Sequence, residues 1–348
     1  MLQNFNHGGF LLTAYVDCKA HFGVAKFMHT VGGGYVTAAL FVLGISAFYM
    51  LKNKDFALAK KSFIVAASFG MLSSLFVLLS GDESGYQVAQ KQPMKLAAME
   101  GLYKGEMDAG IVTGGILNPD KIPGDDKDPF LFEIKVPYAL GLMATRGFNN
   151  FTPGIDDLVF GNEKFGIEGA DKKIQKGKIA LQALKDYKAA KDANDTAAMQ
   201  RAREILFSDQ NMQNLGYGYF DDAKQIVPPV ALTFYSFHVM VALGSYFIVL
   251  FLVTLYLSMA NDISKFKKIL RLCVCSIPLG YVACEAGWIV AEVGRQPWAI
   301  QDLMPVGVAA TSLAGTNIMI SFALFAVLFT VLFIAEIKIM LKQIKIGF

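Results

Sequence analysis

The stretch FMHTVGGGYVTAALFVLGISAFYML, residues 27–51, decides the fold class, because none of its 25 residues is Asp, Glu, Lys or Arg. A helix needs about 20 consecutive, mostly apolar residues to cross the hydrocarbon core of a bilayer. Over the whole chain, 54% of the residues are hydrophobic and 18% are charged, which is outside the range of ordinary soluble domains. The sequence therefore predicts a membrane protein.

Four further stretches have the same character, and the only charged residue within them is Glu285. They are residues 62–81, 226–261, 272–291 and 303–335. Together with residues 27–51 they give five candidate membrane spans. The predicted fold class is all-α, a polytopic transmembrane helix bundle with a large extramembrane loop.

The flanking basic residues indicate the orientation. If the five spans alternate, eleven Lys and Arg residues fall on one side: Lys52, Lys54, Lys60, Lys61, Lys265, Lys267, Lys268, Arg271, Lys338, Lys342 and Lys345. An excess of Lys and Arg marks the cytoplasmic side. We expect no signal peptide, because the N-terminal residues lack a basic start and a small-residue cleavage site. Nothing in the charge pattern suggests nucleic acid.

The predicted organisation has four parts: an N-terminal outer segment (1–22), two spans (23–80), an extracytoplasmic loop (81–225), and three spans with a cytoplasmic C-terminus (226–348). Within the loop, residues 171–206 are rich in Ala, Lys and Leu and predict one or two surface helices. The NPDKIPGDDKDP stretch, residues 118–129, predicts a flexible loop.

The stretch EAGWIVAEVGRQPW, residues 285–298, places ionisable residues in an apolar segment. On a helix, Glu285, Glu292 and Arg295 would lie on one side, with Trp288 between the two carboxylates. Ionisable residues within a membrane span are functional candidates by default.

His29 precedes three glycines, Gly32, Gly33 and Gly34. The histidine could be an interfacial side chain, a donor in helix packing, or a ligand. The glycines would let a large flat molecule or a neighbouring backbone approach closely. Met240, in the third span, is on its own more typical of core packing.

Lys95 and Glu100 fall in a stretch that predicts a short helix begun after Pro93, at the depth of the membrane surface. The plainest interpretation is an ordinary exposed pair.

Five fragments together resemble subunit I of the cytochrome bd quinol oxidases: KFMHTVGGGYVTAALFVLGISAFYMLK, GDESGY, KLAAME, VPYALGLMATR and EAGWIVAEVGRQPWAI. The resemblance runs from about residue 24 to residue 342, and GDESGY together with GRQPW is a highly specific pairing. It implies an electrogenic enzyme of the bacterial cytoplasmic membrane. Such an enzyme oxidises quinol at the outer face and reduces dioxygen to water with low-spin haem b, high-spin haem b and haem d.

The resemblance also assigns roles to individual residues. His29 and Met240 match the axial ligands of the low-spin haem b, a chemically sensible pair because a thioether ligand raises the reduction potential. Lys95 and Glu100 match residues implicated in quinol binding and oxidation. Glu292 matches the carboxylate that serves the high-spin haem b.

In the same segment, Arg295 matches a basic group near the haem propionates, and Trp288 an aromatic side chain between haems. Glu285 has no assigned role beyond the expectation that it is paired or protonated. The family carries an arginine where this chain has His238, so a pH-dependent charge replaces a permanent one.

The fragments correspond to the last five of the family's nine spanning helices. We therefore expect either a truncated product or a missing half supplied by another polypeptide. Two hypotheses follow. In the first, the chain is the C-terminal portion of a quinol:oxygen oxidoreductase subunit that works with subunit II, a small accessory subunit and membrane lipid. In the second, it is a haem-binding and quinol-binding membrane module without oxygen chemistry.

Overall fold

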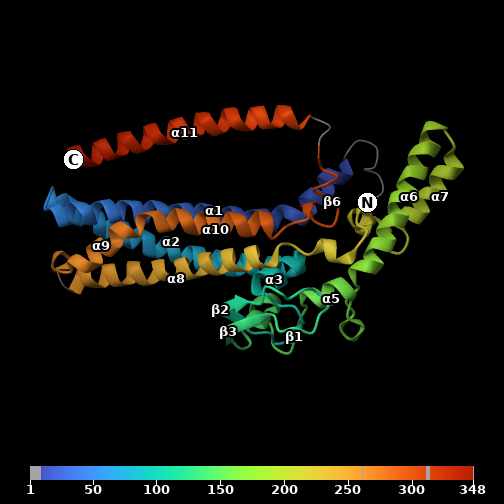
Figure 1. The fold of residues 1–348 in the computed structure, drawn as a ribbon, viewed down its shortest axis with the longest axis horizontal. Helices are drawn as coiled ribbons and strands as arrows, with labels where there is room; N and C mark the ends of the chain where they lie inside the picture. Colours follow the sequence, from blue (N-terminus) through green and yellow to red (C-terminus); the bar gives the residue numbers. More distant parts are fainter. Residues whose placement is uncertain (1–8, 261, 311–313, 348) are drawn as a thin grey trace. The chain divides into compact units, whose positions relative to one another are not determined.

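A computed structural model describes the backbone of residues 9–260, 262–310 and 314–347, and side chains from residue 23 onward within these ranges (Figure 1). The expected outer segment, residues 1–22, thus falls outside the described side chains, and residues 9–22 are described as helical backbone. Within these described ranges, five helical stretches are long and apolar enough to cross a membrane, which confirms the predicted fold class. They are formed by α1 (Gly9–Lys52), α2 (Phe56–Lys91), α8 (Val230–Ala260), α9 (Lys267–Cys275) with α10 (Ile277–Val293), and α11 (Gly315–Ile346).

Helix α2 continues beyond the predicted end of the second span at Gly81. The GDESGY stretch, residues 81–86, forms part of the helix, which ends at Lys91. A hydrogen bond of 2.8 Å from the Gln87 amide to the Glu83 carboxylate, four residues apart, supports the additional turns. The helix ends shortly before Pro93, which lacks the N–H that a helix interior requires.

The last span begins later than expected, at Gly315 instead of Leu303. The residues before it form strand β6 (Met304–Pro305), which pairs with β5 (Trp298–Ile300). Pro305 fixes its own φ angle and supplies no N–H donor, so the apolar run that includes it starts as a strand and a turn.

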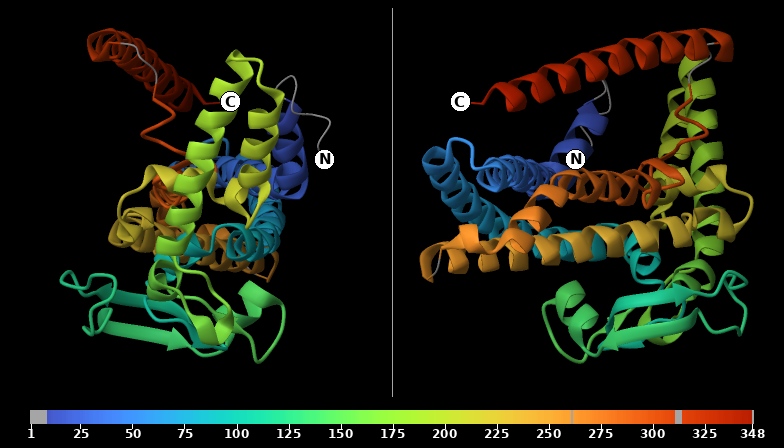
Figure 2. Two further views of the ribbon diagram at one scale, coloured as in Figure 1. Left: turned by 90° about the vertical axis from the view of Figure 1, so that its right-hand side faces the viewer. Right: turned by 60° about the vertical axis from the view of Figure 1, so that its left-hand side comes forward.

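The extramembrane segment combines helices with short antiparallel strand pairs. The expected surface helices are confirmed as α6 (Ala170–Asp192) and α7 (Thr196–Phe207), with the Asp195 carboxylate capping the second. The strands form a hairpin of β2 (Ile111–Leu117) with β3 (Phe130–Val136), visible in Figure 2, and a pair of β1 (Glu106–Met107) with β4 (Phe151–Thr152). The remaining elements are α3 (Pro93–Glu100), α4 (Ala139–Thr145), α5 (Ile155–Phe160), η2 (Glu163–Phe165), η3 (Asn211–Tyr219), η4 (Ala223–Ile226) and η5 (Ile263–Lys265).

The chain divides into two units. The second unit consists of Gly34–Leu75, Ser245–Tyr281 and Ala310–Phe348. In it, close helix contacts use glycine: a Cβ atom on Gly44 would overlap Ile277, and one on Gly70 would overlap Phe251. Small residues at such crossings let helix backbones approach in a membrane.

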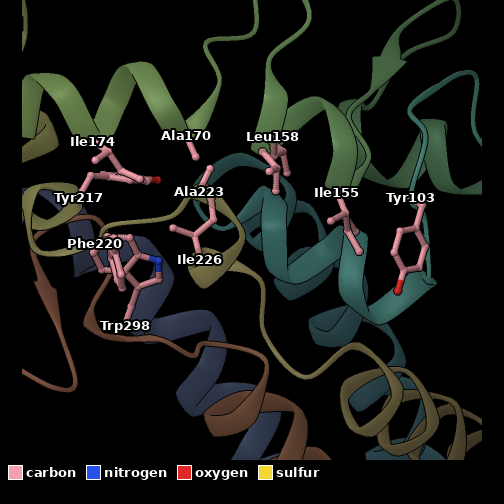
Figure 3. Packing of buried hydrophobic residues seen from close by; sticks show 12 residues of the cluster. Tyr103, Ile155, Leu158, Ala170, Ile174, Tyr217, Phe220, Ala223, Ile226 and Trp298 are labelled. Carbon is pink, nitrogen blue, oxygen red and sulfur yellow. The ribbon is translucent and has the colours of Figure 1, made fainter. Parts of the chain in front are cut away.

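The first unit consists of Met1–Gly33, Phe76–Gly244 and Val282–Ala309. The core of its extramembrane part is aromatic: the rings of Tyr217 and Phe220 lie edge-on to Trp298, with centroid distances of 4.9 and 5.3 Å (Figure 3). Each such ring pair adds about 0.5–1.5 kcal/mol beyond the burial of apolar area. The Tyr217 hydroxyl also donates a hydrogen bond of 2.7 Å to the Asp302 carboxylate. The turn after α10 is therefore fixed to the extramembrane segment.

Candidate functional site

His29 lies on α1, half-buried, with its ring against α2. Its Nδ1 atom lies 3.3 Å from the Ser80 hydroxyl oxygen, and a Cβ atom on Gly81 would approach its Cε1 to 3.1 Å. The Ser80 hydroxyl also lies 3.2 Å from the Val77 carbonyl oxygen, to which it donates; in the tautomer with its proton on Nδ1, His29 donates to this hydroxyl. In a neutral imidazole this leaves a lone pair on Nε2, the state that a metal ligand requires.

The three glycines after His29 differ in their surroundings. A Cβ atom on Gly32 would lie 2.8 Å from Val77 Cγ2 and 3.0 Å from a ring carbon of Phe76, whereas one on Gly34 would meet nothing within 4 Å. Gly32 therefore serves the close approach of α1 and α2, one of the two uses that the sequence suggested.

Met240 and His238 lie on α8. The sulfur of Met240 lies 3.1 Å from the position that a Cβ atom on Gly287 would occupy, so this thioether packs against α10. The ring nitrogens of His238 lie 2.8 Å from the Phe234 carbonyl oxygen and 2.6 Å from that of Val112. At the position where the family is expected to carry arginine, this chain thus has a side chain that ties α8 to β2.

Glu292 and Arg295 form an ion pair at the end of α10. The Nε atom of Arg295 is buried and has no hydrogen-bond partner among the described atoms. The other two residues of the predicted constellation, Glu285 and Trp288, are exposed. The structure thus joins two of the four residues and leaves one guanidinium donor for a further acceptor.

Lys95 lies on α3 and is buried, with 5% of its surface exposed. Its ammonium group donates to the Ala291 carbonyl at 3.3 Å, near the C-terminal end of α10, where the helix dipole favours positive charge. Burial, followed by the positive charges of Lys26 and Arg295, lowers the pKa of Lys95 to about 7. Lys95 therefore lies beside the end of α10, which carries Glu292, and the turn that carries Arg295.

Glu100 ends α3 and is 2% exposed. Its Oε2 atom accepts a long hydrogen bond of 3.4 Å from the Val112 N–H, while its buried Oε1 atom has no partner among the described atoms. Burial raises the pKa of Glu100 to about 7, opposed by the Val112 N–H and the Lys135 charge. The plain interpretation of Lys95 and Glu100 as an exposed pair is therefore wrong.

The two residues serve different surroundings. Five positions along an α-helix turn a side chain by about 140°. Accordingly, Lys95 contacts α10, whereas Glu100 lines a cavity of about 260 Å³ between the end of α3 and the β2–β3 hairpin. We name this space the Glu100 cavity.

A second space lies along α1 and α2. It is an open hollow of about 610 Å³ with mostly apolar walls. Its lining residues are Val24, Ala25, Met28, Phe76, Leu79, Ser80, Glu83 and Gln87. Because Ser80 also contacts His29, the hollow lies next to the candidate ligand.

Two of the sequence fragments meet in the structure. The guanidinium of Arg146, which ends the VPYALGLMATR fragment, lies 2.6 Å from the Asp82 carboxylate and 3.5 Å from that of Glu83. It also lies 5.0 Å from the ring centre of Tyr86. The GDESGY stretch thus holds the end of α4 against α2. Sequence reasoning missed this contact, as well as Ser80 and Lys135, because the sequence does not fix the partners of charged residues far apart in the chain.

The family model for cytochrome bd terminal oxidase subunit I matches residues 16–348 of the chain. The chain is 32% identical to cytochrome bd-II ubiquinol oxidase subunit 1 of Escherichia coli (strain K12), an alignment that covers 92% of this chain and 62% of that protein. It is 28% identical to cytochrome bd ubiquinol oxidase subunit 1 of Bacillus subtilis (strain 168), covering 92% and 56%. Among solved structures, the bd oxidase from Geobacillus thermodenitrificans has a similar fold, with a TM-score of 0.65 at 23% identity, covering 91% and 57%. The chain therefore spans roughly three fifths of the length of these relatives.

Proposed function

Because the chain belongs to the cytochrome bd terminal oxidase subunit I family, we propose that it oxidises quinol and passes the electrons to haem within a bd-type quinol:oxygen oxidoreductase. Relatives of the chain are named ubiquinol and menaquinol oxidases. The observation that carries the proposal is Glu100: a buried carboxylate in the extramembrane segment, with one oxygen that has no partner among the residues that the structure describes.

In this proposal, Glu100 is the base that takes a proton from the quinol hydroxyl as electrons leave. A general base works best when its pKa lies near the working pH. The pKa of Glu100, about 7, meets this condition. Lys95 would orient the head group from the α10 side, where its ammonium group lies at the carbonyl of Ala291.

The apolar part of the quinol would lie in the hollow along α1 and α2. Its walls include Val24, Met28, Phe76 and Leu79, whereas Ser80, Glu83 and Gln87 supply polar groups. A ligand site of this kind, mostly apolar with a few polar groups, suits a lipid-like substrate.

Four residues of the first unit would hold haem. His29 has a lone pair to offer on Nε2, and Met240 supplies the thioether of a low-spin haem b. The unpartnered Nε of Arg295 suits a propionate, and Glu292, now paired with Arg295, would serve the high-spin haem b. When bound, haem b accepts single electrons and haem d carries out the reduction of dioxygen to water. Trp288 would lie between haems.

The remaining parts of the proposal concern the setting. The basic residues that flank the spans support a bacterial cytoplasmic membrane location with the quinol loop on the outer side. The proposed partners are subunit II, a small accessory subunit and membrane lipid. The complete complex would be electrogenic.

The test is Glu100→Gln in the complex purified from native membranes. We expect a large loss of quinol oxidation with an unchanged haem spectrum, because the amide keeps the shape of the side chain but cannot take the proton. Glu168→Gln is the matched control, since Glu168 forms a surface ion pair of 2.7 Å with Lys176. Equal losses of haem and activity in Glu100→Gln would assign Glu100 a structural role instead.

A further inference from the structure

The Glu100 cavity has a charged wall. Nine of its sixteen lining residues carry formal charges. From α3 and the turn after it come Glu100 and Lys104; from β1, Glu106; from the loop after β2, Lys121, Asp126, Lys127 and Asp128; and from β3, Glu133 and Lys135. A space of about 260 Å³ with such a lining is large and polar enough for water, which occupies buried sites with several hydrogen-bonding partners.

Glu100 is the inner end of this wall. Its side chain is buried, whereas Glu106, on the same cavity, has 45% of its side-chain surface exposed. The cavity therefore connects a shielded carboxyl group with groups that solvent reaches. The Oε1 atom of Glu100 has no hydrogen-bond partner among the described residues and is closed to water in this structure, so its proton reaches the cavity only when the surrounding side chains shift.

Lys135 and Glu106 form an ion pair in the wall. The ammonium nitrogen of Lys135 lies 2.6 and 2.9 Å from the two carboxylate oxygens of Glu106. Lys135 favours the ionised form of Glu100, and Glu106 offsets part of that positive charge. The pair thus brings two opposite charges to the cavity that Glu100 lines.

We propose that the Glu100 cavity is the outlet through which the proton taken by Glu100 reaches the outer solution, and that the Lys135–Glu106 pair controls its release. The inference rests on the proposed role of Glu100. The quinol O–H bond breaks, its proton binds the Glu100 carboxylate, and the electrons leave to haem. The Glu100 O–H bond then breaks and the proton passes to cavity water, which restores the carboxylate.

The proposed outlet for the proton and the side chains beside α10 lie on different sides of α3. Lys95, on the same helix, contacts α10, the helix that also carries Glu292, whereas Glu100 lines the cavity of the hairpin. Proton release on the cavity side therefore does not require the groups on the α10 side to move.

The experiment breaks the ion pair from each side and measures the pH profile of quinol oxidation in the purified complex. Lys135→Met removes a positive charge, so Glu100 holds its proton more tightly and the acid limb of kcat/KM moves to higher pH. Glu106→Gln removes a negative charge and moves the same limb to lower pH. For a unit charge at a separation on the order of 8 Å, water-like screening gives an expected shift of about 0.4 pH unit.

Both variants break the same ion pair, so the test depends on the acid limb moving in opposite directions in the two variants. A purely structural pair would lower the rate in both variants without moving the limb in opposite directions, which would overturn the inference. Lys176→Met and Glu168→Gln break a comparable surface pair away from the cavity and should leave the limb in place.

A second measurement does not depend on turnover. An infrared pH titration, taken as the difference between the wild type and Glu100→Gln, reports the Glu100 carboxyl directly, and its midpoint should shift in the same two directions. If Glu100→Gln keeps full quinol oxidation, the proposed function fails. If Glu100→Gln is inactive but neither cavity variant shifts the midpoint, only the outlet fails.

Discussion

Replacement of Gly32 by alanine should destabilise the chain, whereas the same replacement at Gly34 should not. The added Cβ atom on Gly32 would lie 2.8 Å from Val77 Cγ2, about 0.7 Å inside the separation at which carbon atoms make good contact. Overpacking of this kind costs about 1–3 kcal/mol. At Gly34 the new methyl group would meet nothing within 4 Å.

Both variants gain the same helix propensity, about 1 kcal/mol from glycine to alanine, so this contribution cancels in their comparison. The expected difference is therefore the overpacking cost alone, about 2 kcal/mol, or about 3 °C in unfolding temperature for a chain of 348 residues. The assay is thermal unfolding of the purified complex, followed by intrinsic fluorescence at one scan rate for all samples. A Gly34→Ala protein that melts as early as Gly32→Ala would refute the contact with α2 as the cause.

Three further outcomes are expected. His29→Ala should remove the reduced-state absorption of the low-spin haem b in the purified protein, and an unchanged spectrum would exclude His29 as its ligand. Tyr217→Phe should remove a buried hydrogen bond to a carboxylate, worth about 1.5–3 kcal/mol, and so speed amide exchange in residues 298–305 at least tenfold; unaltered exchange there would contradict the docking. Lys121→Met should accelerate protease cleavage of the loop at 118–129, because the Lys121 ammonium holds Asp125 at 2.5 Å and its carbonyl at 2.7 Å. A cleavage rate equal to that of the wild type would show that another contact holds this loop.

The elements that sequence reasoning found are those with a strong local signal. The apolar block at residues 27–51 needed only its length and lack of charge, and α6 and α7 needed only helix-forming composition. The hairpin of β2 and β3 had no such signal, because its glycines and register irregularities disturb the alternation by which a strand is recognised. Its position over Glu100 depends on tertiary packing.

In the candidate site, too, some features could be predicted from the sequence and others depend on tertiary packing. The resemblance to the family marked His29, Lys95 and Glu100 as candidates, but the burial of their side chains depends on elements distant in sequence. Lys95 is buried because α10 packs against it, and its contact there, Ala291, lies 196 residues further along the chain. Glu100 is buried because β2 folds back over it. The hydroxyl of Ser80, which orients His29, lies 51 residues away and had no feature of its own to distinguish it.

The docking of the turn after α10 has a consequence for chimeric proteins. Trp298 is 4% exposed among side chains of the extramembrane segment, and the Asp302 carbonyl accepts a hydrogen bond of 3.1 Å from the Gly216 N–H. The extramembrane part of the chain is thus assembled from two pieces that are separated in the sequence by the whole of α8, α9 and α10. A chimera that transplants the extramembrane segment of a relative without the turn after α10 would place foreign side chains around the native Trp298. A chimera that takes both the extramembrane segment and the turn after α10 from the same relative would keep together the side chains at the positions of Tyr217, Phe220 and Trp298.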